Sequence, residues 1–232
     1  MNEEVYAHLF EEAYWHSEHH MGDLNVVGKY ALSELARSHG FKVVMTGEGS
    51  DEHFGGYTHF FPDFLREADD TWPASKGDDA ARLAMLEHAE KNFQPVLKGI
   101  KLAKQQNSMF VRRMLNNTAI ADLLTFVPRG DFSSWTEGLQ TIAVQETIAN
   151  NLDGRILELM NTRWHPLHTA EYVFANGAFP SILLACMGDK TEMAHSIEGR
   201  PPFLDHVVTK YANNIPPSLK IKRDQETGEF TE

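Results

Sequence analysis

The stretch VVMTGEGSDEHFGGY, residues 43–57, carries the strongest structural signal in the chain. Its first three residues, Val43, Val44 and Met45, are apolar and two of them are β-branched, which predicts a short buried strand. Four glycines then interrupt the pattern, and such glycines mark unusual backbone angles or the close approach of a ligand. Because ligands of open α/β sheets bind at the carboxyl ends of strands, the loop after Met45 is the candidate site.

Three acids, Glu48, Asp51 and Glu52, follow the strand in this loop. Carboxylates so close along a chain repel one another unless a cation or a cationic side chain offsets their charge. The loop therefore predicts either a bound metal ion or a basic partner from elsewhere.

The charge balance limits the classes of partner. Lys and Arg total 21 against 33 for Asp and Glu, which gives a formal net charge of −12 over 232 residues. Nucleic acids and anionic membranes bind basic surfaces, so we expect neither as a partner. The length is sufficient for one large domain or two small ones.

Cysteine content and hydropathy indicate a soluble protein. The single cysteine, Cys186, excludes a disulfide within the chain, and its place in the apolar run SILLACM favours core packing over nucleophilic chemistry. No run approaches the ~18 apolar residues that span a bilayer, and the acidic start lacks the basic region of a signal peptide. We expect a cytoplasmic location.

Apolar periodicity predicts a mainly helical chain. Asp23 is a candidate cap for a helix ending at Ser38, with Leu24, Val27, Ala31 and Leu35 on its buried stripe. The other expected helices cover residues 3–15, 74–93, 105–124, 135–160 and 167–176, with a further helix starting near residue 52. Only the strand at 43–46 is convincing, although a buried strand needs neighbours for its backbone groups. Either other strands escape detection or the rest of the sheet lies outside this chain.

Two segments, TGEGSDEHFGGY (46–57) and GDKTEMAHSIEGRPPFLDH (188–206), resemble the signature segments of the synthetase domain of glutamine-dependent asparagine synthetases. The segment WHSEHHMGDLNVVGKYALSELARSHGFKVVMTGEGSDEHF is similar to the large fungal-type members of that family. The resemblance covers about residues 10–222. It divides the chain into a partial synthetase domain at 1–222 and a polar tail at 223–232.

The resemblance implies a fold and a reaction. The fold would be the predominantly α-helical portion of an α/β, adenine nucleotide α-hydrolase-like synthetase domain with few strands. The reaction would use ATP and Mg²⁺ to adenylate a small carboxylate such as aspartate, followed by attack of ammonia. Thr46 and Gly47 match positions that line the nucleotide, Asp51 matches the metal-site acid, and Glu48 matches the acid that positions or deprotonates the amine.

The second signature segment leaves alternatives open. Arg200 could hold a phosphate or carboxylate of a ligand, or it could pair with Glu198 or Asp205 and brace the loop, which we favour. Phe203 and Leu204 are expected to anchor this loop in the core.

Two other charged or metal-binding patterns have plain interpretations. His16, His19 and His20 have helical spacing, but without a further ligand set a metal site is the weaker interpretation. Lys29 is expected to be a solvated charge.

The chain also departs from the family pattern. It contains no phosphate-cradling loop of the form Ser-Gly-Gly-x-Asp-Ser and no amino-terminal cysteine of a glutaminase half. We therefore expect a truncated synthetase that would expose a sheet edge as a free monomer, and that repacks, self-associates or pairs with a companion chain. Three functions stay open: a contribution to asparagine-synthetase-like amide formation, a non-catalytic binding protein, and a different reaction on the same scaffold.

Overall fold

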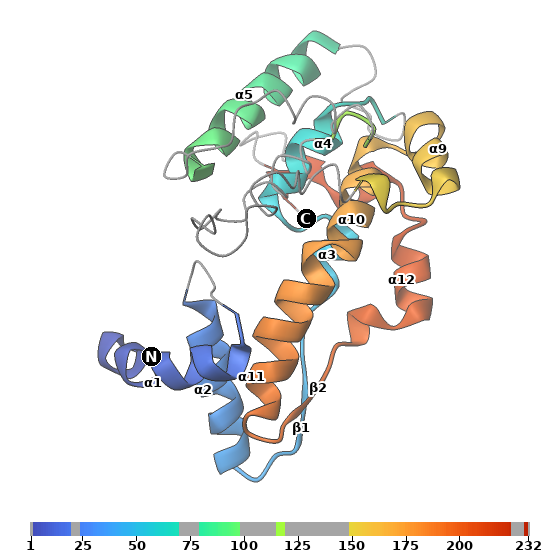
Figure 1. The fold of residues 1–232 in the computed structure, drawn as a ribbon. Coiled ribbons are helices and arrows are strands. Elements are labelled where there is room, and N and C mark those ends of the chain that lie inside the picture. Colours follow the sequence, from blue (N-terminus) through green and yellow to red (C-terminus); the bar gives the residue numbers. More distant parts are fainter. Residues whose placement is uncertain are drawn as a thin grey trace, which may run out of the picture. The chain divides into compact units, whose positions relative to one another are not determined.

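The computed structural model describes residues 2–19, 24–69, 79–97, 115–118, 149–223 and 230–231 (Figure 1). The chain divides into two compact units, one of residues 1–50 and 175–210 and the other of residues 51–174 and 211–232. Three helices pass from one unit into the other: α3 (Ser50–Phe54), α10 (Pro166–Asn176) and α12 (His206–Ala212). The expected domain boundary at residue 222 stays a prediction.

The first unit is built around two long helices, α1 (Glu3–Ser17) and α2 (Asn25–Ser38). Asn2 caps α1, because its Oδ1 accepts the backbone N–H of Val5 at 3.0 Å. The remaining elements are β1 (Val43–Met45), η5 (Phe179–Asp189), α11 (Lys190–Met193), β2 (Glu198–Arg200) and the 3₁₀ turn η6 (Pro202–Leu204). The core combines residues of α1, α2 and η5: Ala13, Val26, Val27, Tyr30 and Met187.

Helix α2 ends at Ser38 as expected, but its buried face differs from the predicted stripe. Leu24 and Leu35 are exposed, whereas Ser33 is buried. The Ser33 hydroxyl donates to the Thr191 carbonyl at 2.9 Å, and its oxygen lies 2.7 Å from Nδ1 of His195, so polar contacts with α11 help to orient the helix. Residues 20–23, including the proposed cap Asp23, lie outside the described residues.

A parallel strand pair resolves the question of the isolated strand. Strand β1 pairs with β2 in the register Val43↔Glu198 and Met45↔Arg200 (Figure 1). Within the described residues, this parallel sheet has two strands. The prediction that β1 is buried is wrong, because Val43 is 39% exposed and Met45 73% exposed. In the described part of the chain, the strand therefore has one neighbouring strand, and its side chains Val43 and Met45 are exposed.

The apolar segment after α10 forms a π-helix, η5, of 11 residues. Cys186 lies in this helix and is buried, which confirms its predicted place in the core. The following loop is not anchored as expected, because Phe203 is 39% exposed and Leu204 is half-buried.

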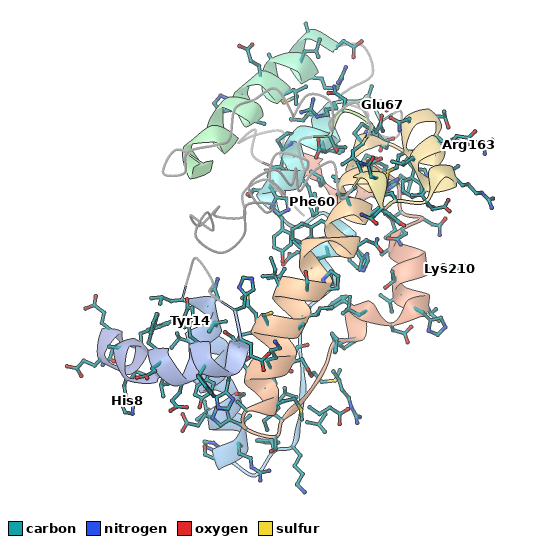
Figure 2. All side chains as sticks on the ribbon, in the orientation of Figure 1. His8, Tyr14, Phe60, Glu67, Arg163 and Lys210 are labelled. Atoms are coloured by element: carbon teal, nitrogen blue, oxygen red, sulfur yellow. The ribbon has the colours of Figure 1, made fainter. Side chains whose placement is uncertain are left out.

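Among its described residues, the second unit consists of helices and one antiparallel strand pair. Its remaining elements are η1 (Thr58–Phe60), α4 (Phe61–Leu65), α5 (Asp79–Leu97), α9 (Gly154–Thr162), α13 (Pro217–Lys220), β3 (Lys222–Arg223) and β4 (Phe230–Thr231). Strands β3 and β4 pair with each other. Lys222 directly precedes the expected tail at 223–232, and the other three residues of the pair lie in it. Figure 2 labels Phe60 of η1. The core near Phe60 is aromatic, because its ring centroid lies 5.9 Å from that of Phe174 on α10.

The helix expected at 135–160 is not continuous over its last part, because residues 151–153 are not helical. Helix α9 begins at Gly154, because Asp153 caps it by accepting the N–H of Arg155 at 2.8 Å. Residues 119–148 lie outside the described residues, as does most of the helix expected at 105–124. Across the described residues, the chain is mostly helical with few strands, which agrees with the predicted helical portion of an α/β domain.

The described residues contain no single helix that is both long and apolar enough to cross a membrane. Two consecutive helical segments, Pro166–Asn176 and Phe179–Met193, meet the length and hydropathy requirements only together, with a bend of 49° between them. Buried residues occur in both segments, as is usual for core helices, so this weak match assigns no membrane span.

Candidate functional site

The loop after β1 keeps an unusual backbone because of its glycines. Gly49 has φ +97°, and a Cβ there would lie 2.4 Å from Cδ2 of Leu204, so this position requires glycine. Gly47 is exposed and has open space around it, since no atom lies within 4 Å of the position of a Cβ. Thr46 is tied to the second strand, because its N–H donates to the Arg200 carbonyl at 3.1 Å.

Glu48 is the best-positioned acid of the loop. Its side chain is 16% exposed, and its Oε1 accepts a hydrogen bond from the ammonium group of Lys29 on α2. Its other oxygen, Oε2, is buried and accepts no hydrogen bond from the described part of the chain. The prediction that Lys29 is a solvated charge is wrong: Lys29 is the cationic partner that the crowded acids require.

A second carboxylate, Glu192 on α11, lies near the same lysine. The Gly199 N–H donates to Glu192, and a Cβ on Gly199 would lie 2.1 Å from Glu192 Oε2. Burial raises the pKa of Glu192, whereas the charge of Lys29 lowers it. Elements distant in sequence thus bring two carboxylates and one ammonium group together within the first unit.

Arg200 lies on β2, beside Met45, but its side chain is directed to a neighbour. Its Nε donates to Glu198 Oε1 at 2.7 Å, and both side chains are exposed. The hydrogen bond with Glu198 raises the pKa of Arg200 and lowers that of Glu198. Asp205 instead caps α12, accepting the Val207 N–H at 2.8 Å. The bracing interpretation of Arg200 fits this arrangement, and a contact of Arg200 with a ligand stays a prediction.

The remaining acids of the loop belong to the second unit. Glu52 is 2% exposed and accepts a hydrogen bond from the Tyr57 hydroxyl at 2.7 Å, so it supports the structure. Burial, and then the bond to Glu52, raises the pKa of Tyr57. Asp51 is half-buried in α3. The parts of the chain described contain no group of three or more His, Cys, Asp or Glu side chains suited to a metal, so its role as a metal ligand stays a prediction.

The second unit contains a buried ion pair that was not predicted from the sequence. Lys220 Nζ donates to Glu171 Oε2 at 2.6 Å, and both side chains are almost fully buried. Burial raises the pKa of Glu171 to about 7, against the opposing effect of Lys220. The sequence signal was Glu171, the single acid of α10, which lies between Ala170 and the apolar residues that follow.

The sequence and these structural features define a class of protein. The family model for asparagine synthase matches residues 1–228, and the chain belongs to that family.

Individual relatives are of two kinds. Over 232 residues, all of this chain and 34% of the relative, the chain is 40% identical to amidase chyE of Penicillium rubens. It is also 40% identical to amidase chry2 of Gibberella zeae, over 96% of this chain and 33% of that protein. Identity to asparagine synthetase [glutamine-hydrolyzing] 1 of Bacillus subtilis is 26%, over 94% of this chain and 32% of that protein. The chain therefore spans about a third of the length of the curated relatives it matches. No solved structure matches it significantly.

Proposed function

We propose that this chain contributes one side of an ATP-dependent amide-forming site. In this reaction a carboxylate oxygen of the substrate bonds to the α-phosphorus of ATP and pyrophosphate leaves. Ammonia then bonds to the acyl carbon, and AMP leaves with the electrons of the broken C–O bond. Aspartate is the first carboxylate to test, because the family includes asparagine synthetases.

The observation that carries this proposal is the state of Glu48. One oxygen is held by Lys29, while the other is buried without a hydrogen-bond partner in the described residues. A buried carboxylate oxygen without a donor is costly, so its retention fits a group that receives a donor from a substrate. An attacking ammonia molecule supplies such an N–H, and Glu48 would take its proton.

Thr46, Gly47 and Asp51 have supporting roles in the proposal. The open space at Gly47 would let a nucleotide approach the backbone of the loop. Mg²⁺ is commonly held by one or two carboxylates together with phosphate oxygens, so the single carboxylate of Asp51 is sufficient as this chain's share of that site. A bound Mg²⁺ would neutralise charge on the departing pyrophosphate. The α/β adenine nucleotide hydrolase-like fold belongs to the same proposal.

The experiment separates the two half-reactions. ATP–pyrophosphate exchange with aspartate and Mg²⁺ reports on adenylation, and asparagine formation from ammonium reports on the amine step. We expect Asp51→Ala to abolish both, whereas Glu48→Gln abolishes asparagine formation and leaves exchange within about threefold. Glu34→Gln, at an exposed acid of α2, is the control. Equal amide formation by Glu48→Gln and the wild type would refute the assignment of the base.

The binding of ATP tests how much of the site this chain supplies. We expect weak or undetectable ATP binding by the isolated chain in calorimetry, because the given sequence contains no phosphate-cradling loop, so both half-reactions are measured at a high ATP concentration. A homo-oligomer or a companion chain stays our proposal for the partner of this chain. Micromolar binding by the isolated chain would contradict this expectation.

A second candidate function rests on the relatives named amidases. Their 40% identity exceeds the 26% found with the asparagine synthetase. The chain would then act on an existing amide or form one on a different carboxylate. Ammonia release from amide substrates without ATP would support hydrolysis, whereas product formation that requires ATP would support the synthetase reaction. A properly folded chain that is inactive in both assays would favour a non-catalytic binding role.

A further inference from the structure

We propose that Lys29 is a positioning residue that fixes Oε1 of Glu48 and leaves Oε2 to accept the proton of the attacking amine. This inference rests on the proposed function for the role of Glu48 as a base. It assigns to α2 a direct part in the site, although sequence analysis placed no site residue there.

The geometry supports this assignment. Lys29 and Glu48 are 19 residues apart and lie on different elements, α2 and the loop after β1. Helix α2 is fixed by its buried face, which includes Val26, Val27 and Tyr30. The loop is fixed on its other side by the close approach of Gly49 to Leu204. The ammonium group therefore projects from one anchored element and holds a carboxylate on another.

The two oxygens of Glu48 consequently have different surroundings. Oε1 accepts the ammonium of Lys29, and Oε2 is buried without a donor in the described part of the chain. A lysine side chain that is 31% exposed retains contact with water and stays charged, so it favours the ionised form of Glu48. An ionised carboxylate with one committed oxygen offers a single, defined acceptor for a proton.

Other acids near Lys29 make its positive charge more important for keeping Glu48 ionised. Glu192 interacts electrostatically with Lys29 and is itself next to Asp189, which raises the pKa of Glu192. Without Lys29, Glu48 would lose its cation while the negative charge of Glu192 stayed in the same unit. Protonation of Glu48 would then become easier, and a protonated Glu48 cannot act as a base.

The test is a direct titration of Glu48 in the full chain. Glutamate labelled with ¹³C at the carboxyl carbon gives one signal per residue, and Glu48→Gln identifies the signal of interest by its loss. We expect Lys29→Met to raise the titration midpoint of Glu48 by about 1–3 pH units, the usual effect of a close opposite charge. Lys29→Arg retains the cation and should keep the midpoint near that of the wild type.

A matched control is available in the same unit. Lys190 pairs with Glu18 at 2.7 Å on the surface, so Lys190→Met removes an equivalent charge from another acid. We expect it to leave the Glu48 midpoint unchanged. An unchanged midpoint in a folded Lys29→Met chain would overturn the proposal, as would an equal shift in Lys190→Met.

A second measurement follows the titration of Lys29 instead of Glu48 and needs no lysine variant. The side-chain ¹⁵N signal of Lys29 is titrated in the wild type and in Glu48→Gln. We expect the midpoint of Lys29 to fall in the variant, and an identical midpoint would refute the proposal even if Lys29→Met failed to fold. Neither titration needs catalysis, so a failed amide assay leaves both results readable. In an active chain, the rate of amide formation falls at low pH as Glu48 becomes protonated. Lys29→Met should shift the midpoint of this fall to higher pH by as many units as it shifts the titration midpoint of Glu48.

Discussion

Replacing Lys220 by methionine should make the second unit lose stability above pH 7. Glu171 and Lys220 are 3% and 4% exposed, and burial raises the pKa of Glu171 from 4.5 to about 7 although Lys220 opposes the rise. Without the ammonium group, burial acts alone and the pKa rises further. A raised carboxyl pKa means that the folded chain binds the proton more tightly than the unfolded chain, so stability falls as pH rises from 4.5 and levels off at the folded pKa.

The magnitude follows from the pH interval. In the wild type the fall levels off near pH 7, whereas in Lys220→Met it continues at about 1.36 kcal/mol per pH unit. Between pH 7 and pH 8.5 the variant therefore loses about 2 kcal/mol more than the wild type. At pH 6.5 both chains keep Glu171 largely protonated, so any difference there reports on effects of the substitution other than the ionisation of Glu171.

Urea unfolding at pH 6.5 and pH 8.5, followed by circular dichroism, measures this difference. The double variant Glu171→Gln/Lys220→Met lacks the titrating acid and should show the same loss at both pH values. His53 and His168 also interact with Lys220, and burial lowers the pKa of each, that of His168 to about 4. Both histidines are present in every chain compared. Because the double variant also lacks Lys220, any change in the titration of the two histidines affects it as it affects the single variant. An equal loss at both pH values in the single variant would refute the reasoning.

Other predictions concern the loop, a helix cap and the exposed strand. Gly49→Ala should lower the free energy of unfolding by about 1–3 kcal/mol, because φ is +97° and Cδ2 of Leu204 lies 2.4 Å from the added Cβ. Gly47→Ala, with no atom within 4 Å, should change it by less than about 0.5 kcal/mol, and equal losses would contradict the comparison. Asp153→Ala should cost about 1 kcal/mol in the same denaturation assay by uncapping α9, and an unchanged value would argue against the cap. Met45→Lys should reduce hydrophobic-dye binding and self-association measured by sedimentation, and unchanged values would show that this strand face is not the exposed surface responsible.

The sequence predicted elements where local signals are strong. Helix α2 ends at Ser38, just before Gly40, whose φ of +83° suits the end of a helix. Strand β1 lies where two β-branched residues precede the glycines. Strand β2 was missed, because Glu-Gly-Arg has no strand-like composition and pairs only through a neighbour distant in sequence.

Buried faces were harder to predict than element positions. Helix α2 has apolar residues around most of its circumference, so several stripes fit the same sequence. Contacts with α1, η5 and α11 select the face that includes Tyr30 and Ser33. Periodicity gives the type of element, but its partners determine which side is buried.

The charged residues of the site show the same limitation. The loop predicted that its acids need cationic partners, and Glu48 has one in Lys29. The identity of that partner could not be predicted, since nothing in the sequence distinguishes Lys29 from a solvated lysine. Glu52 and Glu48 are four residues apart, yet Glu52 accepts a hydrogen bond from Tyr57, whereas one oxygen of Glu48 has no hydrogen-bond donor among the residues that the structure describes. Tyr57 is five residues from Glu52, whereas Lys29 is 19 residues from Glu48, so only the second pairing depends on a residue distant in sequence.

The exposed strand connects the fold to the proposed function. Parallel sheets are normally covered on both faces, because the helical crossovers between their strands pack on those faces. In the described residues, β1 and β2 form a parallel pair whose exposed face includes Val43 and Met45. The same strand leads directly into Glu48, so a partner that covers this face would also lie beside the candidate base. Covering the strand and completing the site are therefore expected to be a single event, and any partner that restores amide formation should also protect Met45 from solvent.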